Sequence, residues 1–261
     1  MRIVSSILLE MPLTDWGWLI TPDELKSWIV CETVDVLVIN KPGLVVCHPS
    51  KQGPWSSLIG ACREYLGVER LHMPSRLDRE TSGVVVFAKN RETASKLQKA
   101  AERRQVRKTY SAILCGELRD RVEVDRPIAR DDTAEYASRQ RVVEDGGYPA
   151  ITEFEPLATA GGYTFARVFP RTGRMHQIRV HASWIGHAVA GDKLYGPDPS
   201  LMLEFAKQGW TTRLASILPI QRHALHAGEI AFLIDAEEQV YTAPLAPDMR
   251  EFCREKMRLE P

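Results

Sequence analysis

The chain has few cysteines, and their arrangement excludes two classes of protein. Its 261 residues contain five, at widely separated positions, so they cannot all pair and none belongs to a C-x-x-C metal motif. A disulfide-stabilised secreted scaffold and a cysteine zinc site are therefore not expected. A reducing cytoplasm is the simplest location for such a chain.

Long apolar runs and two common enzyme motifs are also missing. No run of eighteen apolar residues exists, so no transmembrane helix and no membrane partner are expected. The N-terminal stretch holds one basic residue and is interrupted by Glu10, which is not typical of a signal peptide. The absence of G-x-x-x-x-G-K-[ST] and G-x-S-x-G argues against a P-loop nucleotide-binding protein and an α/β-hydrolase.

The sequence has no net charge, with 34 basic and 34 acidic residues, but the charges are unevenly distributed. Residues 1–40 carry two basic and six acidic side chains, a net charge of −4. Residues 91–110 carry seven basic and two acidic side chains, a net charge of +5, and residues 166–181 contain four arginines and no acid. Such clusters are often solvated helix faces, but two basic segments also suit a polyanion.

The pattern of apolar residues and turn signals predicts one α+β domain. A capping box at Thr21 and Glu24 begins one helix, Gly67 ends a second, and a third lies within residues 90–105. Strands are expected within residues 35–40, 44–48, 84–88, 107–118, 150–158, 163–170, 223–234 and 239–249. We expect a mixed, mostly antiparallel central sheet flanked by helices and loops, formed by residues 31–261 after a short extension, residues 1–30.

A further helix, ending at Gly186, contains an unusual arginine. Its predicted buried stripe consists of Met175, Ile178, Ala182 and Ile185. Arg179 borders this stripe and needs a carboxylate partner, because a lone buried charge costs several kcal/mol. Asp78, just before the strand at residue 84, is one candidate. Spacing alone does not separate a structural ion pair from a catalytic one.

Histidines occur in two pairs, His176 with His181 and His223 with His226. Neither pair has a third ligand at a spacing typical of metal sites, so no metal is expected.

Four segments, in order, resemble the RluA-type pseudouridine synthase family. DVLVINKPGLVVCHPS is similar to its Asn-Lys-Pro motif, and SRLDRETSGVVVFAKN to its R-L-D-x-x-T-S-G signature. RKTYSAILCG is similar to its Lys-x-Tyr strand, and RTGRMHQIRVHASWIGHAVAGDKLYG to its T-G-R-x-H-Q-I-R-V-H segment with a Gly-Asp-x-x-Tyr-Gly tail. The resemblance covers about residues 33–250 and implies the catalytic fold of that family.

The resemblance implies an enzyme that isomerises uridine in structured ribosomal or transfer RNA to pseudouridine without a cofactor. It places the catalytic aspartate at Asp78, the active-site tyrosine at Tyr110 and the aspartate-pairing arginine at Arg179. Arg76 falls on the arginine that displaces the target base, and Ile178 is expected to contact the substrate.

These residue types suit that chemistry. A guanidinium facing Asp78 favours the ionised carboxylate, which is needed for attack or for proton abstraction at the ribose. Tyr110 offers a ring for uracil to stack on and a hydroxyl, although a phenol with a pKa near ~10 is a poor base. A stacked uridine must be flipped out, and Arg76 can fill the vacated space. A surface ion pair with Glu80 is the alternative for Arg76.

The chain also departs from the family pattern. Ser75 stands where histidine usually precedes Arg-Leu-Asp, and only about thirty residues precede the core, too few for the N-terminal RNA-binding domain of many relatives. RNA selection is then expected to depend on the catalytic domain and on loops at residues 119–147 and 197–222. Thr81, Ser82 and Gly83 are expected to shape the turn that presents Asp78, with Arg79 and Glu80 solvated.

Two other functions stay open at this point. One is a catalytically silent relative that binds RNA, and the other is a cofactor-free hydrolase acting on nucleosides. We expect the protein to act as a monomer.

Overall fold

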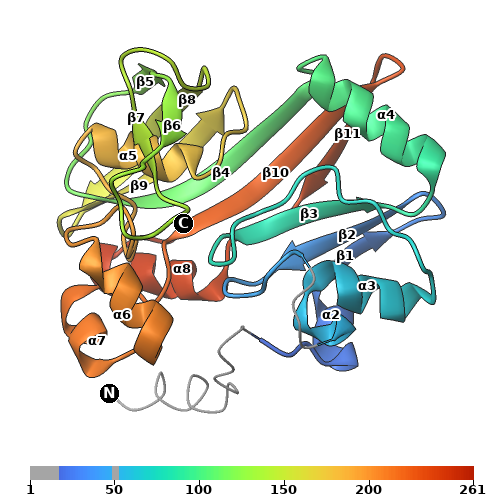
Figure 1. Ribbon diagram of the computed structural model, residues 1–261, viewed down its shortest axis with the longest axis horizontal. Helices are drawn as coiled ribbons and strands as arrows, with labels where there is room; N and C mark the ends of the chain where they lie inside the picture. Colours follow the sequence, from blue (N-terminus) through green and yellow to red (C-terminus); the bar gives the residue numbers. More distant parts are fainter. Residues whose placement is uncertain (1–17, 49–52) are drawn as a thin grey trace.

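A mixed sheet runs through the structure, a computed structural model that describes residues 18–48 and 53–261 (Figure 1). Its nine strands are β1 (Ile29–Glu32), β2 (Val36–Lys41), β3 (Ser82–Ala88), β4 (Val106–Cys115), β5 (Val122–Asp125), β8 (Ile151–Ala160), β9 (Tyr163–Pro170), β10 (Leu225–Ile234) and β11 (Glu237–Thr242). Strands β6 (Ile128–Arg130) and β7 (Gln140–Val142) form a separate antiparallel pair.

Helices lie around this sheet (Figure 1). They are α2 (Pro22–Trp28), α3 (Leu58–Leu66), α4 (Arg91–Glu102), α5 (Gln177–Trp184), α6 (Ser200–Gln208), α7 (Thr212–Ile217) and α8 (Pro247–Phe252), with a 3-10 turn η1 (Pro54–Ser56) and a π-helical turn η2 (Cys253–Met257). No helix in the described part of the chain has the length and apolarity needed to cross a bilayer.

The strand order is β1-β2-β3-β10-β4-β9-β8-β5, with β11 also paired to β10. All neighbours are antiparallel except β3 and β10, which are parallel. This confirms the predicted α+β class with a mixed, mostly antiparallel sheet. Strand β10 pairs with β4 along most of its length, so β3 and β11 share its other edge. Strand β3 is paired there only at His226 and Ala227, and β11 pairs with the same edge of β10 from Glu229 onward.

Separate apolar clusters hold the layers together. The largest covers β3, β4, β9 and β10, where Phe232 and Ile113 are buried. A second cluster joins α2 and α3 to the sheet, because Leu25, Leu58 and Phe87 are fully buried between them. The helix predictions at both places are confirmed: the Thr21 capping box is formed, and Gly67 caps α3 in the left-handed conformation that favours glycine.

The predicted strand at residues 44–48 is wrong. Leu44 has a positive φ of 71°. The carbonyl oxygens of the next two residues accept hydrogen bonds from a lysine side chain and from a helix end, and not from a neighbouring strand. The buried Lys41 ammonium donates to Val45 O at 2.9 Å, and the N–H of Leu58, at the start of α3, donates to Val46 O at 2.8 Å. These side-chain and helix-end donors replace a neighbouring strand as partners for this backbone.

Two further expectations need correction. The helix predicted near residue 174 begins at Gln177, since His176 before it has a left-handed backbone with φ 57°. Met175 is therefore outside the helix and exposed instead of buried. Residues 197–222 are not only loop, because α6 and α7 lie there around a small core of Leu201, Leu214 and Leu218.

A buried polar cluster fixes the turn before β3. Arg222 donates to Ser82 Oγ at 3.0 Å, to Glu80 O at 2.9 Å and to both carboxylate oxygens of Asp248 at 2.7 and 2.9 Å. The Glu80 carboxylate accepts from Lys193 Nζ at 3.0 Å, and the Glu80 side chain is almost fully enclosed. The expectation of a solvated Glu80 is therefore wrong, because its charge is neutralised inside the protein.

Histidines complete the same cluster. His226 Nδ1 lies 3.0 Å from Ser82 Oγ, and His223 Nε2 lies 2.7 Å from Thr81 Oγ1. The backbone N–H of Thr81 donates to Asp78 O at 3.2 Å, which closes the expected turn. The turn is therefore held from below by groups of β10 and the segment before it.

Gly83 is the residue of this turn that tolerates no side chain. Its φ is 116°, and a Cβ there would overlap the backbone of Ala227 on β10. We expect Gly83→Ala to lower the free energy of unfolding by about 2–4 kcal/mol, through backbone strain and overpacking. Urea denaturation measures this. Gly173→Ala is the matched control, since a Cβ at Gly173 would meet no atom within 4 Å, and equal stability of the two variants would contradict this explanation.

Stability should also fall in mild acid because His226 is buried as a neutral side chain. Burial lowers the pKa of His226 from 6.5 to about 4 in the folded protein. Between these values the unfolded chain binds a proton that the folded chain does not, so stability is complete above pH 6.5 and is lost as the pH falls toward 4.

We expect the His226 contribution to fall by about 2 kcal/mol between pH 7.5 and pH 5.0. Denaturant midpoints at the two pH values test this, with His226→Gln as the variant that lacks the titrating group. If His226→Gln loses as much stability as the unmodified protein over this interval, His226 does not cause the loss.

Candidate active site

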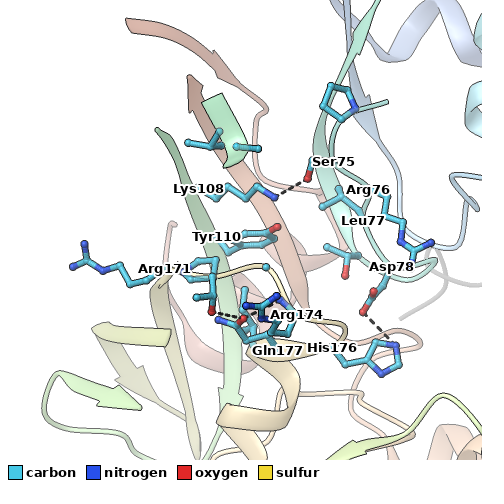
Figure 2. A pocket seen from close by; sticks show the side chains of 18 of the residues that line it. Ser75, Arg76, Leu77, Asp78, Lys108, Tyr110, Arg171, Arg174, His176 and Gln177 are labelled. Carbon is cyan, nitrogen blue, oxygen red and sulfur yellow. Dashed lines mark hydrogen bonds and ion pairs between the residues drawn. The ribbon is translucent and has the colours of Figure 1, made fainter. Parts of the chain in front are cut away.

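A cleft of about 630 Å³ brings together segments that are far apart in the sequence. Its walls come from the turn before β3 (residues 74–81), the end of α4 with the start of β4 (101–110), and the segment from β9 into α5 (170–179). Leu225 and Phe232 of β10 complete it. Figure 2 shows Lys108 and Tyr110 on one side of this space and Asp78 on the other.

Asp78 and Arg179, 101 residues apart in the chain, meet in the cleft. Arg179 Nη1 donates to Asp78 Oδ2 at 3.0 Å, so the pairing predicted from the sequence is confirmed. The side chain of Arg179 is 8% exposed and that of Asp78 is 32% exposed. The carboxylate is therefore held by a buried cation while it stays accessible from the cleft.

A second carboxylate, Asp192, orients Arg179. Arg179 Nε and Nη2 donate to the two oxygens of Asp192 at 2.6 and 2.9 Å, and the N–H groups of Leu194 and Tyr195 donate to Asp192 Oδ1. Burial alone would raise the pKa of Asp192, but Arg179 and these hydrogen bonds hold it below its usual value. With two of its nitrogens held this way, the guanidinium can point only its remaining edge at Asp78.

Tyr110 lines the cleft from β4. It is buried, and burial together with the negative charge of Asp78 raises the pKa of its hydroxyl above the usual value. The phenol therefore stays protonated near neutral pH and loses its proton less readily than a free tyrosine does. The side chain can offer a ring face and a neutral hydroxyl to a bound ligand.

Ser75, the departure from the family pattern, has a partner on the same strand as Tyr110. Lys108 Nζ donates to Ser75 Oγ at 2.6 Å (Figure 2). Lys108 stands two residues before Tyr110, so both side chains lie on one face of β4. Burial lowers the pKa of Lys108. Ser75, at the position where the family usually has histidine, therefore accepts a hydrogen bond from a lysine that lines the cleft.

The structure also brings the remaining predicted residues to the cleft. Arg76 is exposed at its edge and Ile178 is buried in its wall. Glu80, the alternative partner of Arg76, instead accepts from Lys193 and from the N–H of His223. Arg104, Arg171 and Arg174 also line the cleft, so its rim carries several positive charges that suit a polyanion.

Sequence reasoning missed three residues of this arrangement. Asp192 and Tyr195 belong to the Gly-Asp-x-x-Tyr-Gly tail, and His176 lies in the R-x-H-Q-I-R segment. All three lie in segments that resemble the family, and this is the feature that could have identified them. Their spacing in the sequence does not show that they lie around Arg179. In the described residues, no three side chains of the types that ligate metals come together.

Comparisons with known proteins agree with this geometry. The family model described as RNA pseudouridylate synthase matches residues 35–184. The chain is 34% identical to ribosomal large subunit pseudouridine synthase D of Haemophilus ducreyi, over 88% of this chain and 70% of that protein. It is 35% identical to the protein of the same name from Vibrio vulnificus, over 85% of this chain and 68% of that protein.

Solved structures give the same result. Human RNA pseudouridylate synthase domain containing 4 superimposes with a TM-score of 0.70 at 25% identity, covering 92% of this chain and 96% of the other. Human RNA pseudouridylate synthase domain containing 1 gives a TM-score of 0.64 at 27% identity, with 85% of each chain covered. The chain therefore belongs to the RNA pseudouridylate synthase family, as an RNA isomerase of the RluA type.

Proposed function

We propose that this protein isomerises a uridine of large-subunit ribosomal RNA to pseudouridine, with Asp78 as the catalytic carboxylate. The observation that carries the proposal is the accessible Asp78 carboxylate held at 3.0 Å by the buried Arg179. The names of the bacterial relatives support ribosomal RNA as the substrate. Transfer RNA is the other expected substrate, and mapping of the modified nucleotides distinguishes the two.

The isomerisation rearranges bonds within one nucleotide, so the protein has to position the uridine and supply a charged group beside it. The bond from C1′ to N1 breaks, the uracil turns, and C1′ joins C5, while the C5 proton is lost and N1 gains one. No atom or electron is gained or lost overall, so the reaction consumes no co-substrate. Asp78 supplies the carboxylate, Arg179 pairs with it and orients it, and the Tyr110 ring offers a surface for the detached uracil to stack on.

The rim of the cleft supports an RNA substrate. Arg76, Arg104, Arg171 and Arg174 line the cleft. The segment 91–110, which has a net charge of +5, contains α4 and the start of β4, and its residues from 101 onward form one wall. These charges suit RNA phosphates, and Arg76 is placed to fill the gap left by a flipped base. Ile178 provides an apolar contact for the base within the cleft wall.

We further propose that residues 31–261 form the catalytic domain and that it acts as a monomer in the cytoplasm. The cleft is formed within one chain, which supports a monomer. The five cysteines are free thiols, which supports a reducing compartment. Residues 1–17 of the predicted extension 1–30 lie outside the described residues, and residues 22–28 form α2 on the sheet.

Asp78→Asn should abolish isomerisation while RNA binding is retained, because the substitution removes the ionised carboxylate without changing its size. We expect a rate loss of about a thousandfold or more. Carbodiimide mapping of ribosomal and transfer RNA from a strain that lacks the gene, treated with each protein, measures this. Pseudouridine in transfer RNA alone would overturn the ribosomal target, and none with the unmodified enzyme would overturn the activity.

Arg76→Ala should slow the reaction by about 10- to 100-fold, since flipping a base costs a few kcal/mol that Arg76 is proposed to offset. Arg79→Ala is the matched control: Arg79 is exposed three residues away, does not line the cleft, and its Nε donates a long 3.4 Å hydrogen bond to Leu44 O. Single-turnover rates on the mapped RNA compare the two. Equal rates would show that Arg76 has no special part in base displacement.

A further inference from the structure

His176 is a cleft residue next to Asp78 for which the chemistry above has no use. Its Nε2 lies 3.9 Å from Asp78 Oδ2, too far for a hydrogen bond (Figure 2). The ring lines the cleft, and its side chain is 12% exposed. The backbone of His176 is left-handed, a conformation that is uncommon for residues other than glycine and often marks functional sites.

The hydrogen bonds around Tyr195 point to one tautomer of His176. The backbone N–H of Gln140 donates to Tyr195 Oη at 2.9 Å, so that bond uses the hydroxyl as an acceptor. Tyr195 Oη also lies 2.8 Å from His176 Nδ1, and the hydroxyl proton is free to be donated there. With the hydroxyl as donor, Nδ1 accepts, and the neutral ring then carries its proton on Nε2, the nitrogen nearer to Asp78.

The surroundings of the ring also disfavour its charged form. Burial lowers the pKa of His176 to about 4, and the charge of Arg179 acts in the same direction. Asp78 and Asp192 raise the pKa and Arg76 lowers it, so the charged groups that face the ring do not restore its charge. A neutral imidazole in this tautomer presents one N–H to the cleft and does not compete with Arg179 for Asp78.

We propose that His176 Nε2–H is a fixed hydrogen-bond donor to an oxygen of the flipped uridine, and that Tyr195 is the residue that positions it. The inference rests on the proposed function, because it assumes a uridine beside Asp78. The 3.9 Å gap keeps Asp78 from accepting this proton, and uridine offers carbonyl and ribose oxygens as acceptors. A donor held in place before the substrate arrives needs no reorganisation during the reaction.

The tautomer can be tested on the unmodified protein. Two-dimensional NMR that correlates ring nitrogens with ring protons, on 15N-histidine-labelled protein at pH 6.5, should show His176 neutral and protonated at Nε2. In Tyr195→Phe the ring loses its fixed partner, so the signal should shift toward a mixture of tautomers. A ring protonated at Nδ1, or charged, at pH 6.5 in the unmodified protein would overturn the proposal.

Kinetics test the donor itself. His176→Ala should lower the single-turnover rate by about 10- to 100-fold, as expected for the loss of one hydrogen bond to the reacting nucleotide. His176→Asn should recover part of this loss, because asparagine tolerates the left-handed backbone and offers an N–H donor. Tyr195→Phe should lower the rate less than His176→Ala, since the ring stays in place but loses the partner that fixes its tautomer.

Matched measurements separate this inference from the proposed function. His72→Ala removes a histidine that does not line the cleft and should leave the rate unchanged. Thermal midpoints and RNA affinities of all variants show whether a rate loss arises from misfolding or from weak binding. Pseudouridine formation by the unmodified enzyme with an unchanged rate in His176→Ala would overturn the role of His176 alone, whereas no product from the unmodified enzyme would overturn the proposed function.

Discussion

The site depends on one buried guanidinium that is shared by two carboxylates. Arg179 is enclosed in the protein, and a cation in that position must be paired. Asp192, with no exposed surface, takes two of its nitrogens and is itself saturated by backbone N–H groups. The remaining nitrogen points to Asp78, which is partly exposed to the cleft. With the same side chain, the fold pairs a buried charge and holds a carboxylate that is accessible from the cleft.

A second buried cation holds the turn that carries Asp78. Arg222 links the backbone of Glu80 and the hydroxyl of Ser82 to Asp248 of α8, and the Glu80 carboxylate is neutralised by Lys193. Gly83 lets β3 approach β10 closely at the point where the two strands are parallel. The charged stretch SRLDRETSG is thus divided between groups that face the cleft and groups that anchor the turn beneath it.

The family pattern is retained where the chemistry is proposed and altered beside it. Asp78, Tyr110 and Arg179 meet in one cleft, while Ser75 replaces the usual histidine and accepts a hydrogen bond from Lys108. A serine is shorter and carries no charge, so the lysine is held by a neutral acceptor near the face of the cleft that holds Tyr110. This pair differs from the family pattern, and both of its residues line the cleft.

The sequence by itself determined the local elements and the identity of the family. Capping residues, apolar periodicity and glycine stops predicted α2, α3, α4 and most strands, because these signals act over a few residues. Spacing also required a partner for Arg179, but the partner lies 101 residues away and a second one, Asp192, could not be inferred. Whether Glu80 is solvated, where residues 44–48 bond, and which group contacts His176 Nδ1 were decided only by tertiary structure, because each depends on groups brought from distant segments.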